Sequence, residues 1–196
     1  MDKLIQWDID LFLFLNNIHN SFWDEVMWFI SGKYEWIPLY VILLGVIIWK
    51  FRMKSILVIL MIPILITAAD QISVKLFKEV FERLRPCHNP EIQHLVHTVN
   101  NKCGGKFGFV SSHAANSFAL AGFLSLIFTN KWFNLFILFW AAVVSYSRVY
   151  LGVHYPGDIL VGALLGLIIG YLVYLLFQFI ERRFWKEKAH QPITAS

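Results

Sequence analysis

A histidine and an aspartate stand four residues apart in the segment His154-Tyr155-Pro156-Gly157-Asp158. Proline is typical of the first position of a helix, which places His154 just before a helix and Asp158 in its first turn. A carboxylate there can accept the imidazole N–H, fix the ring tautomer and leave the other ring nitrogen as a nucleophile. The alternative is that Asp158 only complements the helix dipole.

A second histidine, His113, stands at the start of a long apolar stretch, in Phe109-Val110-Ser111-Ser112-His113. An imidazole at the mouth of an apolar helix indicates proton transfer, and a structural histidine is the alternative. The free backbone N–H groups at such a helix start form an anion site. Ser111 and Ser112 either add hydroxyl groups to that site or serve only as the helix cap.

Fixed positive charges accompany these groups. Lys78 and Arg85 are seven residues apart, so a helix that runs to Pro86 would present both on one face. Arg148 follows Ser147 at the end of another apolar stretch. Such cations suit a phosphate group, and ordinary snorkelling of Lys and Arg to the membrane surface is the alternative.

These candidates fall into three sequence blocks, which are Lys78 with Arg85-Pro86, then Ser111-Ser112-His113, then Ser147-Arg148 with His154 and Asp158. The blocks resemble the three-part signature of the type-2 phosphatidic acid phosphatase superfamily. The family's second motif usually reads Pro-Ser-Gly-His, and here Val110 and Ser112 stand in place of the proline and the glycine. Losing that glycine affects the anion site only if the backbone there needs a positive φ.

The resemblance implies a metal-independent phosphohydrolase that uses no cofactor and acts through a covalent phosphohistidine. In that scheme His154 attacks phosphorus while Asp158 orients it, and His113 protonates the leaving oxygen and later activates water. The residues that the resemblance assigns to the phosphate oxygens are Lys78, Arg85, Ser111, Ser112 and Arg148. Three rival classes are a vanadate-binding haloperoxidase, whose known members are soluble, a lipid phosphotransferase, and a scaffold or transporter that only binds the anion.

The composition of the chain shows which elements must position these residues. Hydrophobic residues make up 58% of the 196 residues and charged residues only 15%. A soluble domain carries about 25% charged residues, so this chain cannot be a soluble globule. The net charge of +4 comes without a long basic run, which argues against a nucleic-acid partner.

Apolar stretches of membrane-spanning length predict an all-α, polytopic membrane helix bundle with about five spans. The predicted spans are residues 36–49, 55–77, 107–128, 132–153 and 159–180. Before them, Leu4, Leu11, Leu15 and Ile18 recur with helical spacing, which is typical of an amphipathic helix in the membrane interface. A second short interfacial helix is expected over residues 22–30. The predicted organisation is interfacial helices in residues 1–35, a membrane core in 36–180 and a basic cytoplasmic tail in 181–196.

The basic residues predict the orientation of the bundle. Five spans place eight of them on each side of the membrane. One set is Lys50, Arg52, Lys54, Lys131, Arg182, Arg183, Lys186 and Lys188. The opposite set includes the predicted anion ligands, so the first set is placed in the cytoplasm. We therefore expect a multi-pass protein of the bacterial inner membrane whose site faces the periplasm or exterior.

A pocket at the outer helix ends, open to the bilayer, fits a lipid whose phosphate lies at headgroup depth. The resemblance suggests undecaprenyl pyrophosphate first, with phosphatidic acid, phosphatidylglycerophosphate and lipid A phosphates as alternatives. The expected partners are therefore a lipid phosphate and the bilayer. The sequence indicates no particular oligomeric state.

Other residues serve the structure of the bundle. Cys87 and Cys103 predict a disulfide in the outer loop, and the alternative is a zinc site that adds His88, His94 and His97. Asp70 is expected to face the bundle interior, because an aspartate is costly in lipid. Glycines at every fourth position of the last span, at residues 162, 166 and 170, predict close helix packing.

Overall fold

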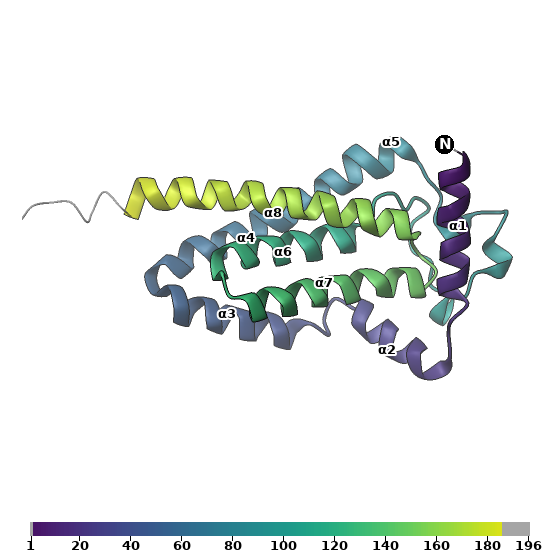
Figure 1. The fold of residues 1–196 in the computed structure, drawn as a ribbon, viewed down its shortest axis with the longest axis horizontal. Coiled ribbons are helices and arrows are strands. Elements are labelled where there is room, and N and C mark those ends of the chain that lie inside the picture. Colours follow the sequence, from purple (N-terminus) through teal and green to yellow (C-terminus); the bar gives the residue numbers. More distant parts are fainter. Residues whose placement is uncertain (1, 186–196) are drawn as a thin grey trace, which may run out of the picture.

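The computed structural model describes residues 2–185 of the chain, and this part consists of helices and connecting segments without a β-strand. Five long helices run along one axis (Figure 1). They are α3 (Ile37–Phe51), α4 (Ser55–Ile72), α6 (Ser112–Phe128), α7 (Lys131–Tyr150) and α8 (Pro156–Trp185). The predicted all-α helix bundle is confirmed.

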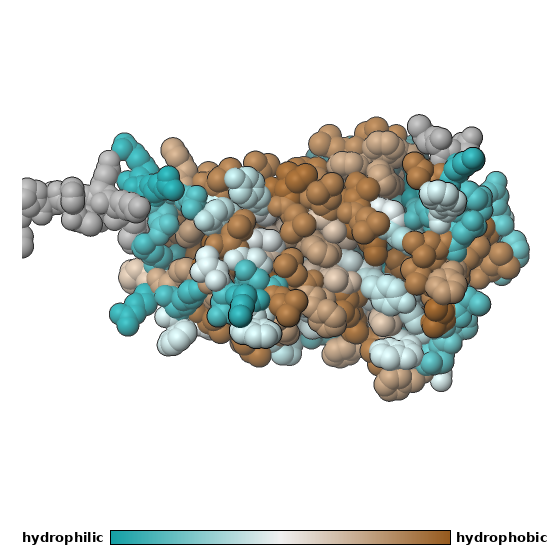
Figure 2. Space-filling model, in the orientation of Figure 1, coloured by the Kyte–Doolittle hydropathy of each residue, from teal (hydrophilic) through white to brown (hydrophobic). Residues whose placement is uncertain are grey.

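Three segments are long and apolar enough to cross a membrane. They are Ile37–Phe81, which contains α3 and α4, then Lys131–Tyr150 and Pro156–Phe184, while α6 is apolar but shorter. Hydrophobic residues cover most of the middle of the visible face, and hydrophilic residues gather towards its two ends (Figure 2). Large apolar side chains such as Ile42, Phe139 and Leu164 are exposed on the bundle. This apolar belt suits a lipid environment.

Helices α6 and α8 pack closely because three glycines line one side of α8. A Cβ atom at Gly162 would lie 2.7 Å from the carbonyl oxygen of Ser111, and one at Gly170 would lie 2.8 Å from that of Ala119. Any larger residue would therefore push the two backbones apart. The close packing predicted from the glycine spacing is confirmed, and it fixes the start of α8 against the start of α6.

Two N-terminal helices, α1 (Asp2–Asn16) and α2 (Ser21–Ser31), confirm the predicted short helices. Helix α1 lies across one end of the bundle, nearly perpendicular to α8 (Figure 1). Its buried face includes Ile9 and Phe12, and the Phe12 ring lies 5.4 Å from that of Tyr155. Leu4 and Leu11, from the predicted apolar stripe, remain exposed and face away from the protein. One face of α1 therefore packs on the protein and a second apolar face stays exposed, as the predicted interfacial helix requires.

The third predicted span, residues 107–128, begins before the helix that the structure shows there. Helix α6 begins at Ser112, because Ser111 has extended backbone angles and its side chain caps the helix by accepting from the Ala114 N–H. The preceding residues instead pair with residues 83–85. Backbone bonds run from Gly108 N to the Arg83 oxygen at 2.9 Å and from Arg85 N to the Lys106 oxygen at 3.1 Å.

The helix that was expected to carry both Lys78 and Arg85 ends earlier than predicted. Helix α4 continues through a π-helical turn, Ser73–Lys78, and the short α5, Glu79–Phe81. Glu82 then takes left-handed backbone angles and ends the helix. Arg85 is extended, as a residue before proline prefers to be. The shared helix face was therefore a wrong prediction.

The connection from α5 to α6 contains three short turns, η3 (Pro86–His88), η4 (Gln93–Leu95) and η5 (Val99–Asn101). A disulfide joins Cys87 and Cys103, whose Cα atoms are 5.9 Å apart. The predicted disulfide is confirmed, and the alternative zinc site is excluded because both thiols are used. The predicted tail of residues 181–196 lies mostly outside the described residues.

Candidate active site

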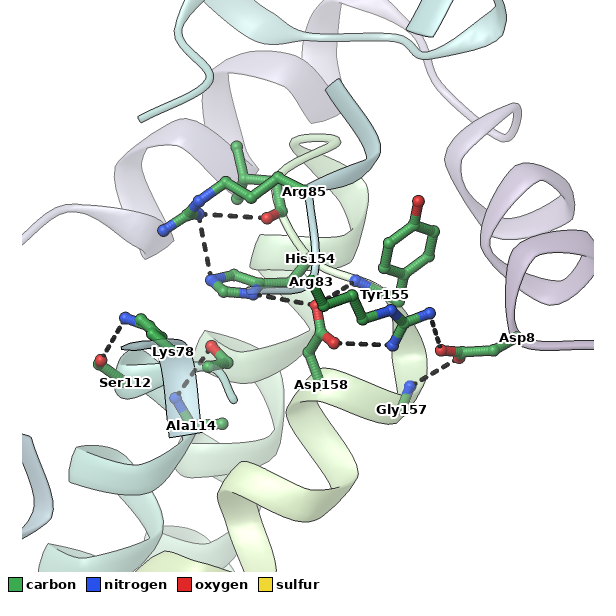
Figure 3. A network of polar contacts seen from close by, with 12 residues as sticks. Asp8, Lys78, Arg83, Arg85, Ser112, Ala114, His154, Tyr155, Gly157 and Asp158 are labelled. Carbon is green, nitrogen blue, oxygen red and sulfur yellow. Dashed lines mark hydrogen bonds and ion pairs between the residues drawn. The ribbon is translucent and has the colours of Figure 1, made fainter. Parts of the chain in front are cut away.

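Three segments meet at the end of the bundle that α1 crosses, and backbone hydrogen bonds hold them together. The Ser111 N–H, at the start of α6, donates to the carbonyl oxygen of Asp158 in α8 at 3.1 Å. The His154 N–H donates to the carbonyl oxygen of Arg148, near the end of α7, at 3.2 Å. These bonds join the second and third sequence blocks, and the first block joins them through Arg85, whose Nη1 atom donates to the Val153 carbonyl oxygen at 3.1 Å. Part of this region is drawn in Figure 3.

His154 lies at the centre of a hydrogen-bonded chain. Its Nδ1 atom is 3.3 Å from Oδ2 of Asp158, and its Nε2 atom is 3.2 Å from Nη1 of Arg85. Arginine can only donate and an ionised carboxylate can only accept. Nδ1 therefore carries the proton, and the lone pair of Nε2 points towards the Arg85 guanidinium. The predicted contact between Asp158 and the imidazole is therefore present, and Oδ2 of Asp158 also accepts from the Tyr155 N–H at 3.0 Å.

The environment of His154 disfavours the imidazolium form. The side chain is only 1% exposed. Burial, together with the positive charges of Arg85, Arg148 and Lys78, holds the pKa of His154 well below its ordinary value of 6.5. The ring is therefore neutral near pH 7, which is the form that a nucleophile needs.

The low pKa of His154 predicts how kcat/KM depends on pH. As pH falls from 8 to 6.5, His154 stays neutral, so its protonation should not reduce kcat/KM in this range. The decline caused by this group should begin only well below pH 6.5. Steady-state kinetics from pH 4.5 to 8.5 would measure it, once the second ionisation of the substrate phosphate, with a pKa of about 6, has been determined by titration and allowed for. A loss of kcat/KM with a midpoint at or above 6.5 would contradict the prediction.

The predicted phosphate ligand Lys78 contacts the start of α6. Its Nζ atom donates to Oγ of Ser112 at 2.6 Å, and that hydroxyl is 2.8 Å from Oγ of Ser73. Ser112 has helical backbone angles and no positive φ. The replacement of the family's glycine by serine therefore causes no backbone strain, and its hydroxyl positions Lys78.

The chain of hydrogen bonds around His154 does not include His113, which lines a neighbouring cavity. The cavity has a volume of about 800 Å³ and lies among α3, α4, α6 and α7. Ser112, Asp70 and Lys33 also line it, and its deeper wall is apolar, with residues such as Leu43 and Leu124. The expectation that Asp70 faces the bundle interior is confirmed.

Arg148 approaches the same region from α7. Its Nη1 atom donates to the Ser31 hydroxyl at the end of α2, while its Nε atom is buried without a protein partner. The Nε atom of Arg85 is buried without a partner as well. Unsatisfied buried donors are costly in a folded protein, so two arginines at one site with spare donors are suited to an anionic ligand.

Sequence reasoning missed Arg83 and Asp8. Arg83 lies in the segment between α5 and η3, next to Leu84, which forms an isolated antiparallel bridge with Phe107. Nη1 of Arg83 lies 2.9 Å from Oδ1 of Asp158, and Nη2 lies 2.8 Å from Oδ2 of Asp8. Pro86 favours an extended backbone at Arg85, the residue before it, but no sequence signal pointed to Arg83 or Asp8.

A possible metal-binding group lies apart from these residues. The side chains of His19, Asp24 and His97 offer ligand atoms that all lie within 4.8 Å of one another. Oδ1 of Asp24 accepts from His97 Nε2 at 2.9 Å and from the Tyr150 hydroxyl at 2.8 Å. Although burial opposes it, these hydrogen bonds bring the pKa of Asp24 below its ordinary value. Asp24, His97 and Tyr150 therefore form an internal hydrogen-bond network that ties α2 to the segment between α5 and α6.

Comparisons with known proteins identify the family of this chain. A family model described as the PAP2 superfamily matches residues 59–182. The lipid A 4'-phosphatase of Bacteroides thetaiotaomicron is 44% identical over 172 residues, which cover 86% of this chain and 76% of that protein. An undecaprenyl-diphosphatase of Sulfolobus acidocaldarius is 31% identical over 175 residues, which cover 87% and 79% of the two chains.

A solved structure is similar over nearly the whole fold. It is the first transmembrane PAP2 type phosphatidylglycerolphosphate phosphatase from Bacillus subtilis, with a TM-score of 0.69 and 27% sequence identity. The match covers 93% of this chain and 90% of the other.

Proposed function

This chain belongs to the PAP2 superfamily, as its motifs predicted, and from that premise we propose that it is a membrane phosphatase that removes a terminal phosphate from a lipid. The observation that carries the proposal is the state of His154. It is buried and neutral, its Nδ1 proton is directed to Asp158, and its Nε2 lone pair is directed to an arginine. A purely anion-binding protein does not need a nucleophile prepared in this way.

The reaction proceeds in two displacements at phosphorus. In the first, Nε2 of His154 forms a bond to phosphorus and the bond to the leaving oxygen breaks. His113, protonated before this step, donates its proton to that oxygen, so the product leaves as an alcohol or as a protonated phosphate ester. In the second, His113 removes a proton from water, the water oxygen attacks phosphorus, and the bond to Nε2 breaks. Inorganic phosphate and the neutral His154 are regenerated.

Positive charge and the start of α6 stabilise the transferring group. Arg85 lies next to the nucleophile, and a phosphate that takes its place as the partner of Nε2 remains within its reach. Lys78 and Arg148 supply the other two charges, and Ser111 and Ser112 lie where α6 begins. Phosphoryl transfer needs mainly positioning and fixed positive charge, which these groups offer without a cofactor.

The cavity beside His113 favours a lipid substrate. Its polar residues lie near the catalytic groups, and its deeper wall of apolar residues suits an acyl chain. The 44%-identical relative is named a lipid A 4'-phosphatase, which supports a lipid A phosphate as the substrate. Undecaprenyl pyrophosphate, which the sequence alone favoured, is the second candidate, supported by the name of the 31%-identical relative.

The basic residues at one end of the bundle support a location for the site. Lys54 pairs with Glu181 at 2.5 Å and Lys50 donates to the Phe128 carbonyl at 2.8 Å, at the end opposite the catalytic groups. The basic residues at that end favour the cytoplasm. The proposed site therefore faces the periplasm of a bacterial inner membrane, where lipid phosphates of the outer leaflet can enter.

A panel of purified lipids tests the substrate. The detergent-solubilised protein should release inorganic phosphate from 4'-phosphorylated lipid A with a kcat/KM at least about tenfold above that for undecaprenyl pyrophosphate, phosphatidic acid or phosphatidylglycerophosphate. Transfer of the phosphoryl group to a second lipid, instead of to water, would identify a phosphotransferase. Cleavage of water-soluble phosphate esters without cleavage of any lipid would overturn the proposal.

A further inference from the structure

The side chain of Arg83, which is not among the predicted site residues, joins the carboxylates of Asp158 and Asp8 on the Nδ1 side of His154. The Arg83 guanidinium donates through Nη1 to Asp158 at 2.9 Å and through Nη2 to Asp8 at 2.8 Å (Figure 3). The three side chains are shielded from solvent, with exposed fractions of 24% for Arg83, 16% for Asp8 and 0% for Asp158. His154 continues the chain at its other end, through the hydrogen bond from Nδ1 to Asp158.

Further contacts hold Asp8 and Arg83 in place. Oδ1 of Asp8 accepts from the Gly157 N–H at 2.7 Å, so α1 contacts the first turn of α8 directly. The Arg83 guanidinium also lies over the Tyr155 ring, with its Cζ atom 4.0 Å from the ring centre. A Cβ at Gly157 would lie 2.8 Å from the Asp8 carboxylate, so only glycine permits this approach. The N-terminal helix is therefore fitted to the catalytic end of the bundle.

We infer that Arg83 and Asp8 are positioning residues for His154, which act through Asp158 and make α1 part of the active site. This inference rests on the proposed function, because it assumes that His154 is the nucleophile. Neither residue belongs to the three motif blocks. The substrate does not need to touch either of them.

The roles follow from how the carboxylate oxygens of Asp158 are divided. Oδ2 accepts from His154 and from the Tyr155 N–H, while Oδ1 accepts from Arg83. Without Arg83, Asp158 would be a buried charge with half of its acceptors unused, which favours rotation or protonation of the carboxylate. Either change weakens the bond that fixes the His154 tautomer.

Asp8 restrains Arg83. With Asp8 in place, one amino group of the guanidinium is committed to α1 and only the other reaches Asp158. Without Asp8, the guanidinium is free to turn both amino groups towards Asp158, because bidentate pairing is the preferred geometry of arginine with a carboxylate. It would then compete with His154 for Oδ2.

The charges of the two residues give a signature that a purely structural role would not produce. The charged and titratable groups around His154 are Arg85, Lys78, Arg148, His113, Asp158 and, behind Asp158, Arg83 and Asp8. Removing the positive charge of Arg83 makes protonation of the His154–Asp158 pair easier, and removing the negative charge of Asp8 makes it harder. The acidic limb of the kcat/KM profile should move in opposite directions in the two variants.

The experiment compares matched substitutions in the full chain. Asp8→Asn should lower kcat about 5- to 10-fold with little change in KM, whereas Asp10→Asn, on the exposed side of the same helix, should match the parent. Arg83→Gln should lower kcat about 30- to 100-fold, and Arg83→Lys should restore part of it. Arg182→Gln, an exposed arginine at the far end of α8, is the control.

The pH profiles separate positioning from loss of folding. Arg83→Gln should move the acidic limb upwards by about one pH unit, and Asp8→Asn should move it downwards by a smaller amount. Thermal melting of each variant shows whether it is folded. Equal shifts in one direction, or unchanged kcat in folded Asp8→Asn and Arg83→Gln proteins, would overturn the inference. A parent protein without phosphatase activity would instead overturn the proposed function.

Discussion

His154→Asn should lower the rate of phosphate release by at least about 10⁴-fold, because it removes the only proposed nucleophile while the anion site remains. Asparagine keeps a polar side chain that can still hydrogen-bond to Asp158, so the fold should survive. The measurement is inorganic phosphate released from a lipid phosphate by the detergent-purified protein. His94→Asn, which changes an exposed histidine of the outer loop, is the matched control and should retain full activity.

A trapping experiment with the same variant identifies the covalent intermediate. Rapid quenching of the parent with a substrate labelled at its terminal phosphate should trap label on the protein, as an acid-labile, base-stable phosphohistidine. His154→Asn should trap none. His113→Asn, which lacks both the acid of the first step and the base of the second, should form and release the label more slowly than the parent. EDTA should leave the parent rate unchanged. Strong inhibition by EDTA, or a His154→Asn protein that keeps substantial activity, would contradict the mechanism.

Arg85→Lys should lower kcat/KM about 10²- to 10³-fold even though the positive charge is kept. Arg85 is buried and its Nη1 atom contacts both His154 Nε2 at 3.2 Å and the Val153 carbonyl oxygen at 3.1 Å. Lysine cannot make these contacts and hold phosphate oxygens at the same time, because it lacks the planar array of five donors. Loss of transition-state contacts should reduce kcat more than it raises KM.

Kinetics with a lipid phosphate measure this effect, and Arg182→Lys provides the control at an exposed site. A folded Arg85→Lys protein with a kcat/KM within threefold of the parent would show that Arg85 does not bind the transferring phosphoryl group. Orthovanadate offers a second readout, because its trigonal-bipyramidal form imitates the transferring phosphoryl group. Arg85→Lys should therefore weaken inhibition by vanadate more than it raises KM.

The sequence by itself determined the class of the protein and most of the proposed chemistry. Long apolar stretches require helices in lipid, because each backbone polar group must be satisfied within its own segment. The offset of four residues between His154 and Asp158 brings both side chains to the start of one helix, so their contact is a local property. The glycine spacing in α8 likewise predicted close helix packing, but the structure was needed to identify α6 as the partner.

Only the tertiary structure decided how the remaining charges are placed. Lys78 and Arg85 were expected on one helix, but a left-handed residue at Glu82 ends that helix, and a single backbone conformation of this kind leaves little trace in a sequence. Asp8 meets Gly157 across 149 positions of the chain. A contact of that range depends on how whole helices pack, and no periodicity within α1 distinguishes Asp8, which reaches Arg83, from Asp10, which remains exposed.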